Sequence, residues 1–416
     1  MRFKCAIGAS FFSLVLLVNL FISSAYGGDF AVSALENTQV VSIYEVVGNY
    51  DSSLSDGTVN SFPRQEIAKE FYKTHQDAYD FLVVFTNFNF QLPEDEAIAQ
   101  YIPIKNDVSG IGVDIFDNSQ SFGSNGKLQG IIDMGNINNL SVNPLAPEFS
   151  DTLGTLSHEL LHRWASFVNF KDQNGTISSA LIGKEGTHWS YLFDTNGSLQ
   201  YGNDWQENGD GTFTSLEGRR YYSPLDLYLM GLLDKAQVPP MLLIENPDIA
   251  PEKISEPGVT ISGKSSYVTI DDIIAAEGER IPTVDASQKA FRIGCVFITN
   301  PGTFQEEDVV AIKNVLQNWT VWFSSLTGGS ATVQTDATVS SSVPTNPGTS
   351  PLPYEIRDVP PEIEDGISWL IANQKESGQW EDSSQTRERD TAEALNALRN
   401  FQVAEQAHSK GVQWFS

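Results

Sequence analysis

The segment around His158 and His162 constrains this chain more than any other part of its 416-residue sequence. The two histidines enclose Glu159 with H-E-x-x-H spacing, inside an apolar run from Leu153 to Phe170 that lacks proline. Residues i and i+4 share one face of a helix, so this spacing lets both imidazoles reach a single cation. Glu159 then lies close enough to hydrogen-bond a water on that cation. Because the chain has only five histidines, chance is a poor explanation of the pattern.

The same run has the apolar periodicity of a helix that is buried on one side. The residues that recur at helical spacing are Thr152, Leu153, Leu156, Leu160, Leu161, Trp164, Phe167 and Val168. Two histidines and a third ligand suit zinc, which keeps one position open for water in catalytic sites. The alternative is a helix that carries ordinary surface histidines and a solvated glutamate.

Upstream, the apolar segment Leu128–Met134 predicts a strand. A strand followed by an H-E-x-x-H helix resembles the zincin metallopeptidases. The resemblance implies an α+β fold with a mixed sheet, in which the helix forms the floor of a cleft and this strand forms its edge. It also implies one catalytic Zn²⁺ and Glu159 as the general base. The implied partner is a protein or peptide substrate, bound as an added strand and cut beside the metal.

The third metal ligand must come from outside the helix. His188 is favoured, because it lies downstream in a glycine-flanked segment and is the only later histidine before the C-terminal tail. The compact metzincin pattern is not present, since Ala165 and Val168 occupy its Gly and His positions. A distant His-Trp pair, here His188 and Trp189, resembles the arrangement in leishmanolysin instead. The alternative is a loop histidine stacked on Trp189.

Two carboxylates compete with His188 for this role. Glu185 follows the helix at a distance similar to that of the ligand Glu in thermolysin-like gluzincins, but without their surrounding motif. Asp226 lies in an apolar segment, where Pro224 suits the first turn of a short helix and Gly231 suits its C-cap. Asp226 could be a metal ligand, an acceptor for a ligating imidazole, or an N-terminal residue stabilised by the helix dipole.

The same short helix contains two further candidates. Tyr228 could donate a hydrogen bond to the oxyanion that develops during peptide hydrolysis, so it joins Glu159 as a predicted catalytic residue. Met230 could form the floor of the site, as the methionine of metzincins does. Tyrosine and methionine at such positions are more often ordinary core residues.

The N-terminus has the features of a secretory signal over residues 1–27. Arg2 and Lys4 precede an apolar run from Phe11 to Ile22, and small residues follow at the cleavage positions. We expect a secreted or periplasmic protein without stable membrane insertion after cleavage; an uncleaved anchor is the alternative. Cleavage leaves Cys295 as the sole cysteine, so no intrachain disulfide can form, which favours bacterial or archaeal export. Its apolar neighbours predict a buried strand thiol.

Loss of the signal would leave 23 of the 25 basic residues against 53 acidic ones. This excess of negative charge repels phosphate backbones and anionic membranes, which argues against nucleic acid as a partner. It also supplies oxygen ligands for Ca²⁺, and the Asp, Asn and Gly clusters between Asp194 and Gly211 are candidates for a structural calcium site. Those residue types are equally good turn formers, and no complete calcium-loop spacing is present.

Residues 29–337 predict one mixed domain, and a Ser/Thr/Pro/Gly-rich linker follows over residues 338–358. Further elements are expected from apolar periodicity and from caps. They are a helix at Pro63–Tyr79, a strand at Tyr79–Thr86, a helix at Val268–Ala275 capped by Thr269 or Asp271, a strand at Ala290–Thr299 and a helix at Gln305–Leu326.

Residues 359–416 predict a partial α/α repeat. A glycine and a tryptophan recur after 45 residues, as Gly366 with Gly411 and Trp369 with Trp414. The pattern resembles the α/α toroids of prenyltransferase- and squalene-cyclase-like domains, of which the chain covers little more than one repeat. Stacked repeats cannot bury their faces singly, so we expect a sequence that is cut short and a helical accessory segment without catalysis.

The features of the whole chain predict a secreted, zinc-dependent metallopeptidase. The alternative is a catalytically inactive zincin-like protein that serves in binding or adhesion and holds a structural metal. Three protein ligands with one open position favour the first interpretation, whereas closure by a fourth side chain favours the second. No sequence feature fixes an oligomeric state.

Overall fold

A computed structural model of the chain describes most of residues 30–336 and a small part of the C-terminal region. The described residues are 30–37, 40–55, 57–93, 97–183, 186–216, 221–248, 256–336, 369–375 and 377–380, with Thr391, Ala394, Ala407, Lys410 and Trp414. The chain divides into two compact units, residues 1–342 and 343–416. The predicted signal, residues 1–27, and the predicted linker, residues 338–358, lie outside the described residues.

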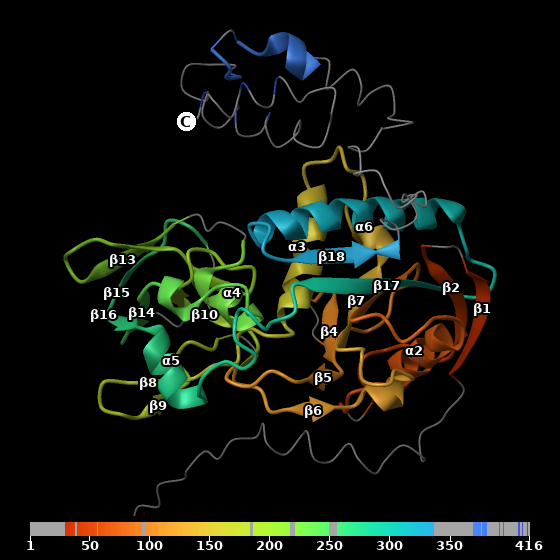
Figure 1. Ribbon diagram of the computed structural model, residues 1–416, viewed down its shortest axis with the longest axis horizontal. Coiled ribbons are helices and arrows are strands. Elements are labelled where there is room, and N and C mark those ends of the chain that lie inside the picture. Colours follow the sequence, from red (N-terminus) through yellow and green to blue (C-terminus); the bar gives the residue numbers. More distant parts are fainter. Residues whose placement is uncertain are drawn as a thin grey trace, which may run out of the picture. The chain divides into compact units, whose positions relative to one another are not determined.

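A seven-stranded mixed sheet forms the centre of the first unit (Figure 1). Its strands follow the order β1-β2-β17-β3-β7-β4, and β18 also pairs with β17. Their bounds are β1 (Ala31–Asn37), β2 (Ser42–Val47), β3 (Phe81–Thr86), β4 (Gln100–Pro103), β7 (Gly130–Asn136), β17 (Ala290–Thr299) and β18 (Thr332–Thr335). The four central strands are parallel, whereas β1 and β4 pair antiparallel with their neighbours. The fold is therefore mixed α+β.

Helices cover both faces of this sheet. On one face α2 (Phe62–Thr74) contributes Ile67 and Phe71 to a buried apolar cluster. On the other face lie α3 (Phe149–Leu161) and α6 (Glu306–Leu326), which contribute Leu156 and Trp319 to a larger cluster. Because both faces are covered, the central strands are continuous apolar runs, and every residue of β3 is buried.

The chain between α3 and β17 forms smaller sheets beside the large one (Figure 1). One sheet has the order β11-β10-β14-β16 and another the order β12-β13-β15. The elements of this region are β8 (Phe170–Lys171), β9 (Ile177–Ser178), β10 (Trp189–Asp194), β11 (Tyr201–Asn203), β12 (Trp205–Glu207), β13 (Thr212–Ser215), β14 (Met241–Glu245), β15 (Thr260–Ser262), β16 (Lys264–Val268), α4 (Pro224–Met230) and α5 (Ile270–Glu277). Before α3, the short strands β5 (Lys105–Asn106) and β6 (Phe116–Asp117) pair with each other. Short 3₁₀ turns lie at η1 (Ser119–Phe122), η2 (Ile137–Asn139) and η4 (Lys235–Gln237).

Several elements lie where the sequence predicts them. The strand expected at Ala290–Thr299 is β17, and the helix expected at Gln305–Leu326 is α6. Thr269, and not Asp271, caps α5 in a capping box with Asp272. The burial of Cys295 is also confirmed, and it raises the pKa of the thiol far above its usual value.

Two expectations for the region around the H-E-x-x-H motif are wrong. The segment predicted to edge a cleft is β7, which is an internal strand because β4 pairs outside it. The helix predicted to continue to Phe170 ends at Leu161, with His162 as its C-cap. The chain then turns, Ser166 has a left-handed φ of 74°, and Trp164 stays in the apolar core.

Among the described residues of the second unit, residues 369–373 are helical, as are Thr391, Ala394, Ala407, Lys410 and Trp414. The indole of Trp380 donates to the Leu370 carbonyl at 2.7 Å, and Trp380 is buried. Gln374 donates to the Ala407 carbonyl, which links the start of this unit to its end. A helix followed by a Gly-Trp turn agrees with the sequence prediction for this segment. The toroid resemblance itself stays a prediction.

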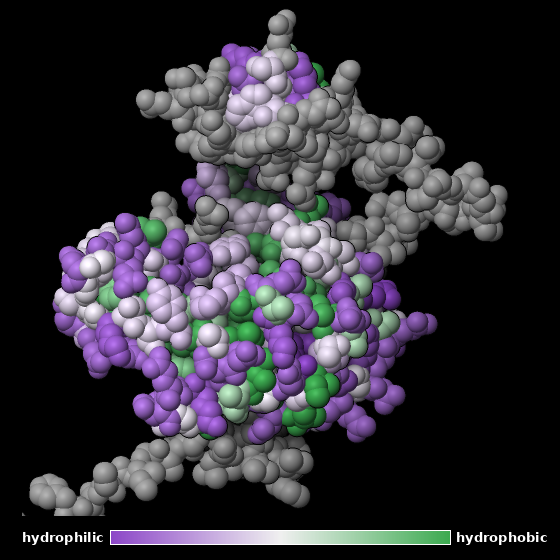
Figure 2. Space-filling model, turned by 60° about the vertical axis from the view of Figure 1, so that its left-hand side comes forward, coloured by the Kyte–Doolittle hydropathy of each residue, from purple (hydrophilic) through white to green (hydrophobic). Residues whose placement is uncertain are grey.

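The face of the first unit drawn in Figure 2 is mostly hydrophilic. Figure 2 shows polar side chains over most of the visible face, interrupted by small apolar areas. Within the described part of the chain, no helix combines the length and the apolar character needed to cross a membrane.

Candidate metal centre

His158, His162 and His188 come together in the folded chain, and they could bind a metal ion. Each offers a ring nitrogen, and these nitrogens all lie within 4.8 Å of one another. The Nε2 atom of His158 is 3.2 Å from Nε2 of His162 and 3.2 Å from Nε2 of His188. Among the described residues this is the one group of three or more His, Cys, Asp or Glu side chains with such spacing.

The orientation of His158 is fixed by a backbone carbonyl. Its Nδ1 lies 2.5 Å from the carbonyl oxygen of Leu199. A carbonyl only accepts hydrogen bonds, so Nδ1 carries the proton and Nε2 presents its lone pair. Gln200, the next residue, donates from its side chain to the His158 carbonyl at 2.8 Å. The loop at Leu199 thus holds both the ring and the backbone of this histidine, as carbonyls commonly do for metal-binding imidazoles.

The nitrogen spacing fits a tetrahedral metal better than it fits a hydrogen bond. Two ligands at about 2.0–2.1 Å from zinc lie about 3.3 Å apart at the tetrahedral angle. The two separations of 3.2 Å are close to that value. A neutral His158 with its proton on Nδ1 has one lone pair on Nε2, which cannot accept from both other rings at once. The spacing of the three rings is therefore compatible with three ligands of one metal ion.

Hydrogen bonds at Ser157, one residue before the H-E-x-x-H motif, hold the end of α3 in place. The hydroxyl of Ser157 donates to the Leu153 carbonyl and accepts from the indole of Trp319 on α6 at 3.0 Å. The hydroxyl of Tyr222 donates to the Ser157 carbonyl at 2.9 Å. These groups are buried, so the C-terminal end of α3 has little freedom to move.

His188 reaches the other two histidines from the segment that precedes β10. The Gly183 N–H donates to the His188 carbonyl at 2.8 Å, which closes a short loop. A Cβ on Gly183 would lie 2.6 Å from the Ser190 Cα, so this close approach requires glycine. Gly186 has a left-handed φ of 73°. Glu185, the other candidate in this loop, lies outside the described residues.

Asp226 lies outside the histidine cluster, where it supports Trp189. Its carboxylate is fully buried and accepts from the Trp189 indole at 2.9 Å and from the Ser198 hydroxyl at 2.6 Å. It also forms a capping box with Ser223 at the start of α4, whose C-cap is Gly231 as predicted. Burial raises the pKa of this carboxyl, although its hydrogen bonds act in the opposite direction. The structure thus favours Asp226 as a helix cap and as the hydrogen-bond acceptor of Trp189, and not as a metal ligand.

Tyr228 also lies away from the imidazoles. The residues that act on its hydroxyl are Arg280, Glu279 and Lys235, and burial raises its pKa. Met230, from the same helix, is an ordinary member of the apolar core. Neither residue therefore occupies the position that the resemblance implies.

Tyr201 is the tyrosine that contacts the histidine cluster. Its ring centroid is 4.6 Å from that of His188 and 5.5 Å from that of His158. Tyr201 has a φ of 68°, a conformation that costs a non-glycine residue about 1–3 kcal/mol. The Thr195 hydroxyl holds it there by donating to its carbonyl at 2.9 Å. No motif or spacing marks Tyr201 in the sequence, so sequence reasoning missed it.

The protonation state of His162 suits a metal ligand. Burial, together with the neighbouring rings of His158 and His188, holds its pKa well below 6.5. The ring is therefore neutral near pH 7, and a neutral imidazole is the form that binds a metal.

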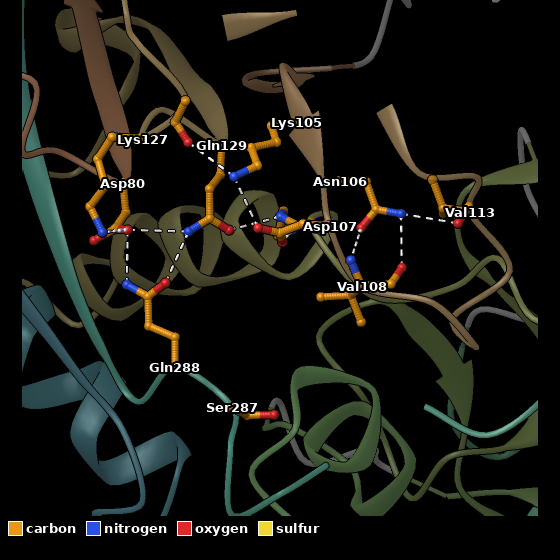
Figure 3. Close-up of polar contacts among 12 residues, drawn as sticks. Asp80, Lys105, Asn106, Asp107, Val108, Val113, Lys127, Gln129, Ser287 and Gln288 are labelled. Atoms are coloured by element: carbon orange, nitrogen blue, oxygen red, sulfur yellow. Dashed lines mark hydrogen bonds and ion pairs between the residues drawn. The ribbon is translucent and has the colours of Figure 1, made fainter. Parts of the chain in front are cut away.

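Arg163, the residue after His162, connects the end of α3 by hydrogen bonds to Gln129, Asn106 and Asp107. Its Nε donates to Gln129 at 3.0 Å, and Nη1 and Nη2 donate to Asn106 at 2.8 Å and Asp107 at 3.0 Å. Figure 3 shows these partners in one polar network, in which Gln129 also bonds to Asp80. A buried arginine with three acceptors fixes the direction in which the chain leaves the helix. This network has no signature in the sequence.

The acidic segment between Asp194 and Gly211 does not gather three carboxylates around one point among its described residues. Asp194 and Asp204 do influence each other, and burial with this repulsion raises the pKa of Asp194 to about 6. The Asp194 side chain accepts from the Asn196 N–H at 2.9 Å, which is a turn interaction. This hydrogen bond agrees with the turn-forming alternative.

Comparisons with known proteins give no family for this chain. No protein-family model, no curated protein and no solved structure matches it. The evidence for a site is thus the H-E-x-x-H sequence and the convergence of three imidazoles on one point.

Proposed function

We propose that this protein is a secreted zinc metallopeptidase, in which His158, His162 and His188 hold the metal and Glu159 is the general base. The observation that carries the proposal is the pair of 3.2 Å separations between Nε2 atoms. Three neutral imidazoles leave a fourth position of a tetrahedral zinc for water or substrate, as in hydrolytic zinc sites. The acidic composition and the signal-like residues 1–27 support an exported protein.

In the proposed hydrolysis, the zinc ion and Glu159 on α3 have separate roles. A zinc ion held by the three rings would lower the pKa of a bound water to about 7 and polarise the scissile carbonyl. Glu159 follows His158 on α3 and is buried beside the ligands. Its carboxylate would accept the proton of the attacking water and pass it to the leaving amine, a role typically worth 10²–10⁴-fold in rate. His158 keeps its orientation because the Leu199 carbonyl accepts from its Nδ1.

The position of β4 supports a peptide substrate. This strand is at the edge of the large sheet, pairs antiparallel with β7, and contacts α3. An edge strand offers unpaired N–H and C=O groups, to which an extended peptide can add as a further strand. A substrate bound in this way would lie beside the helix that carries Glu159. The zincin-like architecture is thus part of the proposal, with β4 in the role first expected for β7.

Tyr201 takes the role that the sequence suggested for Tyr228. Its ring lies against His188 and His158, and 37% of its surface is exposed. A phenol at that position can donate to the negative charge that develops on the substrate oxygen. The strained backbone of Tyr201 supports a functional reason for keeping this ring in place.

The test is the pair of variants Glu159→Gln and Glu148→Gln on the same helix. Glu159→Gln should bind one zinc per chain and lose casein hydrolysis by about 10³-fold or more, because the base is lost while all three imidazoles remain. Glu148 is exposed at the N-cap and makes no capping bond, so its variant should keep both zinc and activity. Equal activity of Glu159→Gln and the wild type would overturn the mechanism, and so would a wild-type protein that takes up zinc without hydrolysing any protein or peptide substrate.

A further inference from the structure

A pocket of about 190 Å³ lies at the end of β10 that is farther from His188. Its walls come from β10, β12, β14, β16 and the start of α4. Small-molecule sites typically measure about 300–1,000 Å³, so a pocket of this size suits one amino-acid side chain. Its lining residues include the acids Asp194 and Glu207 and no Lys, Arg or His.

Asp194 is a partly buried acid, and no cation among the described residues acts on its pKa. Burial and the charge of Asp204 raise its pKa to about 6, and the groups that act in the opposite direction are backbone N–H donors of Asn196 and Trp205. A carboxylate in such a place repels further negative charge and attracts a cation. Glu207 is exposed at the same pocket and adds a second negative charge.

Aromatic and proline residues form the apolar walls. Trp205 is buried, and its indole donates to the Tyr191 carbonyl at 2.9 Å, which fixes the ring. Tyr267 is 55% exposed, and its hydroxyl donates to Glu207 at 3.3 Å. Pro239 and Pro240 add a rigid segment to the lining. Such walls suit a methylene chain, and an aromatic face also attracts an ammonium or guanidinium group.

We propose that this pocket binds the side chain of a lysine or arginine residue of a protein or peptide. The cationic group would lie between Asp194 and Glu207, and the aliphatic stem would lie against Trp205 and Tyr267. The whole chain has a formal net charge of −28, so a basic partner is also attracted at long range.

This site does not depend on the metal centre. β10 begins at Trp189, directly after His188, and ends at Asp194, so His188 and Asp194 are separated by about 20 Å along an extended strand. Binding at the pocket can therefore be measured in the presence of a chelator. Failure of the zinc proposal would leave this measurement unaffected, and failure of the pocket would leave the zinc proposal intact.

The experiment is calorimetric titration of the full chain with Nα-acetyl-lysine methylamide, its arginine analogue and its norleucine analogue. Lysine and arginine analogues should bind at least about tenfold more tightly than norleucine, which has the stem without the charge. Asp194→Asn should weaken lysine binding by about tenfold or more, since a charge-assisted hydrogen bond is lost. Glu207→Gln should weaken it less, because Glu207 is exposed.

The matched control is Glu245→Gln, which removes one negative charge from β14 outside the pocket. It should leave lysine binding unchanged. Asp194→Asn keeps an oxygen that can accept from the Asn196 N–H, and if it still fails to fold, Glu207→Gln and Tyr267→Leu test the same pocket from exposed positions. Three results would overturn the proposal: no binding of the lysine analogue up to about 20 mM, equal binding of norleucine, or equal losses in the pocket variants and the Glu245 control.

Discussion

At the residue scale, we expect different roles for His188, in the candidate metal centre, and Asp226, which accepts from the neighbouring Trp189. The Nε2 atom of His188 lies 3.2 Å from that of His158, so its removal would delete a ligand. The two oxygens of Asp226 accept from Trp189, Ser198 and the Ser223 N–H, so their loss would leave buried donors unpaired. One residue is therefore expected to affect the affinity for metal and the other the stability of the fold.

His188→Ala should lower the affinity for zinc by about 100-fold or more and change the unfolding free energy of the metal-free protein much less. Asp226→Asn should lower that free energy by about 2–4 kcal/mol, because its amide group would face other donors. Zinc titration against a competing chelator and urea unfolding of the metal-free protein measure the two effects. Loss of zinc in Asp226→Asn, with zinc retained in His188→Ala, would instead indicate a site with two histidines and a carboxylate.

Asp194 should make the free energy of unfolding depend on pH, and Asp194→Asn should remove this dependence. Its pKa rises from 3.8 to about 6 on folding, mainly through burial, so the folded state holds the proton more tightly than the unfolded state. The free energy of unfolding therefore falls as pH rises from about 4 to about 6, and stays level above that range. Relative to the wild type, Asp194→Asn should gain stability over this interval. Urea unfolding at pH 4, 5, 6 and 7.5 tests this, and parallel curves for the two proteins would contradict it.

At the candidate metal centre, the sequence identifies only the residues that a local spacing pattern or residue scarcity marks. Helical spacing predicts His158, Glu159 and His162, and the scarcity of histidine leaves His188 as the third ring. Tyr201 and Arg163 could not be predicted in this way, because their roles depend on a left-handed backbone and on acceptors far away in the sequence. The same limit applies to Tyr228, on which Arg280, Glu279 and Lys235 act and none of the three histidines.

At the element scale, α3 is well packed but contains a glycine that its helix does not need. Gly154 lies in the helix interior, and a Cβ there would meet the Leu199 side chain at 4.0 Å, an ordinary van der Waals distance. Glycine in a helix costs about 0.5–1 kcal/mol relative to alanine. The added methyl group would also contact the residue whose carbonyl orients His158.

Gly154→Ala should therefore raise the free energy of unfolding by about 0.5–1 kcal/mol and leave zinc affinity unchanged. Gly183→Ala is the contrasting variant, since its Cβ would lie 2.6 Å from the Ser190 Cα and would displace the loop that carries His188. It should lower both stability and zinc affinity. Chemical denaturation and zinc titration of the two variants test the packing of α3 and of this loop. A destabilised Gly154→Ala protein would show that the helix is packed differently.

Elements with strong apolar periodicity are predicted well, whereas their ends and neighbours are not. β17 and α6 match their predicted ranges almost residue for residue. The end of α3 at Leu161 was missed because nothing in the apolar pattern changes there; the turn depends on Ser166 and on the partners of Arg163. The edge position of β4 was missed because strand order is a property of long-range pairing and not of local sequence.

At the scale of the whole molecule, the metal centre joins parts of the first unit that share one core. The large apolar cluster contains Leu156 from α3, Trp189 from β10, Leu229 from α4 and Trp319 from α6. His158 and His162 belong to the end of α3, and His188 directly precedes β10. An ion bound to all three would therefore link α3, which packs on the large sheet, to the smaller sheet that contains β10. The boundary between the two units, at residues 342 and 343, falls within the linker predicted from composition.

The most direct test of the central claim is a crystal structure of the zinc-loaded protein, with anomalous diffraction recorded at the zinc absorption edge. We expect one strong peak per chain, about 2.0–2.1 Å from the Nε2 atoms of His158, His162 and His188, with a fourth position not filled by a carboxylate or thiolate. A zinc peak elsewhere, or a His188 ring outside coordination distance of the ion, would contradict the three-histidine centre and the metallopeptidase proposed from it.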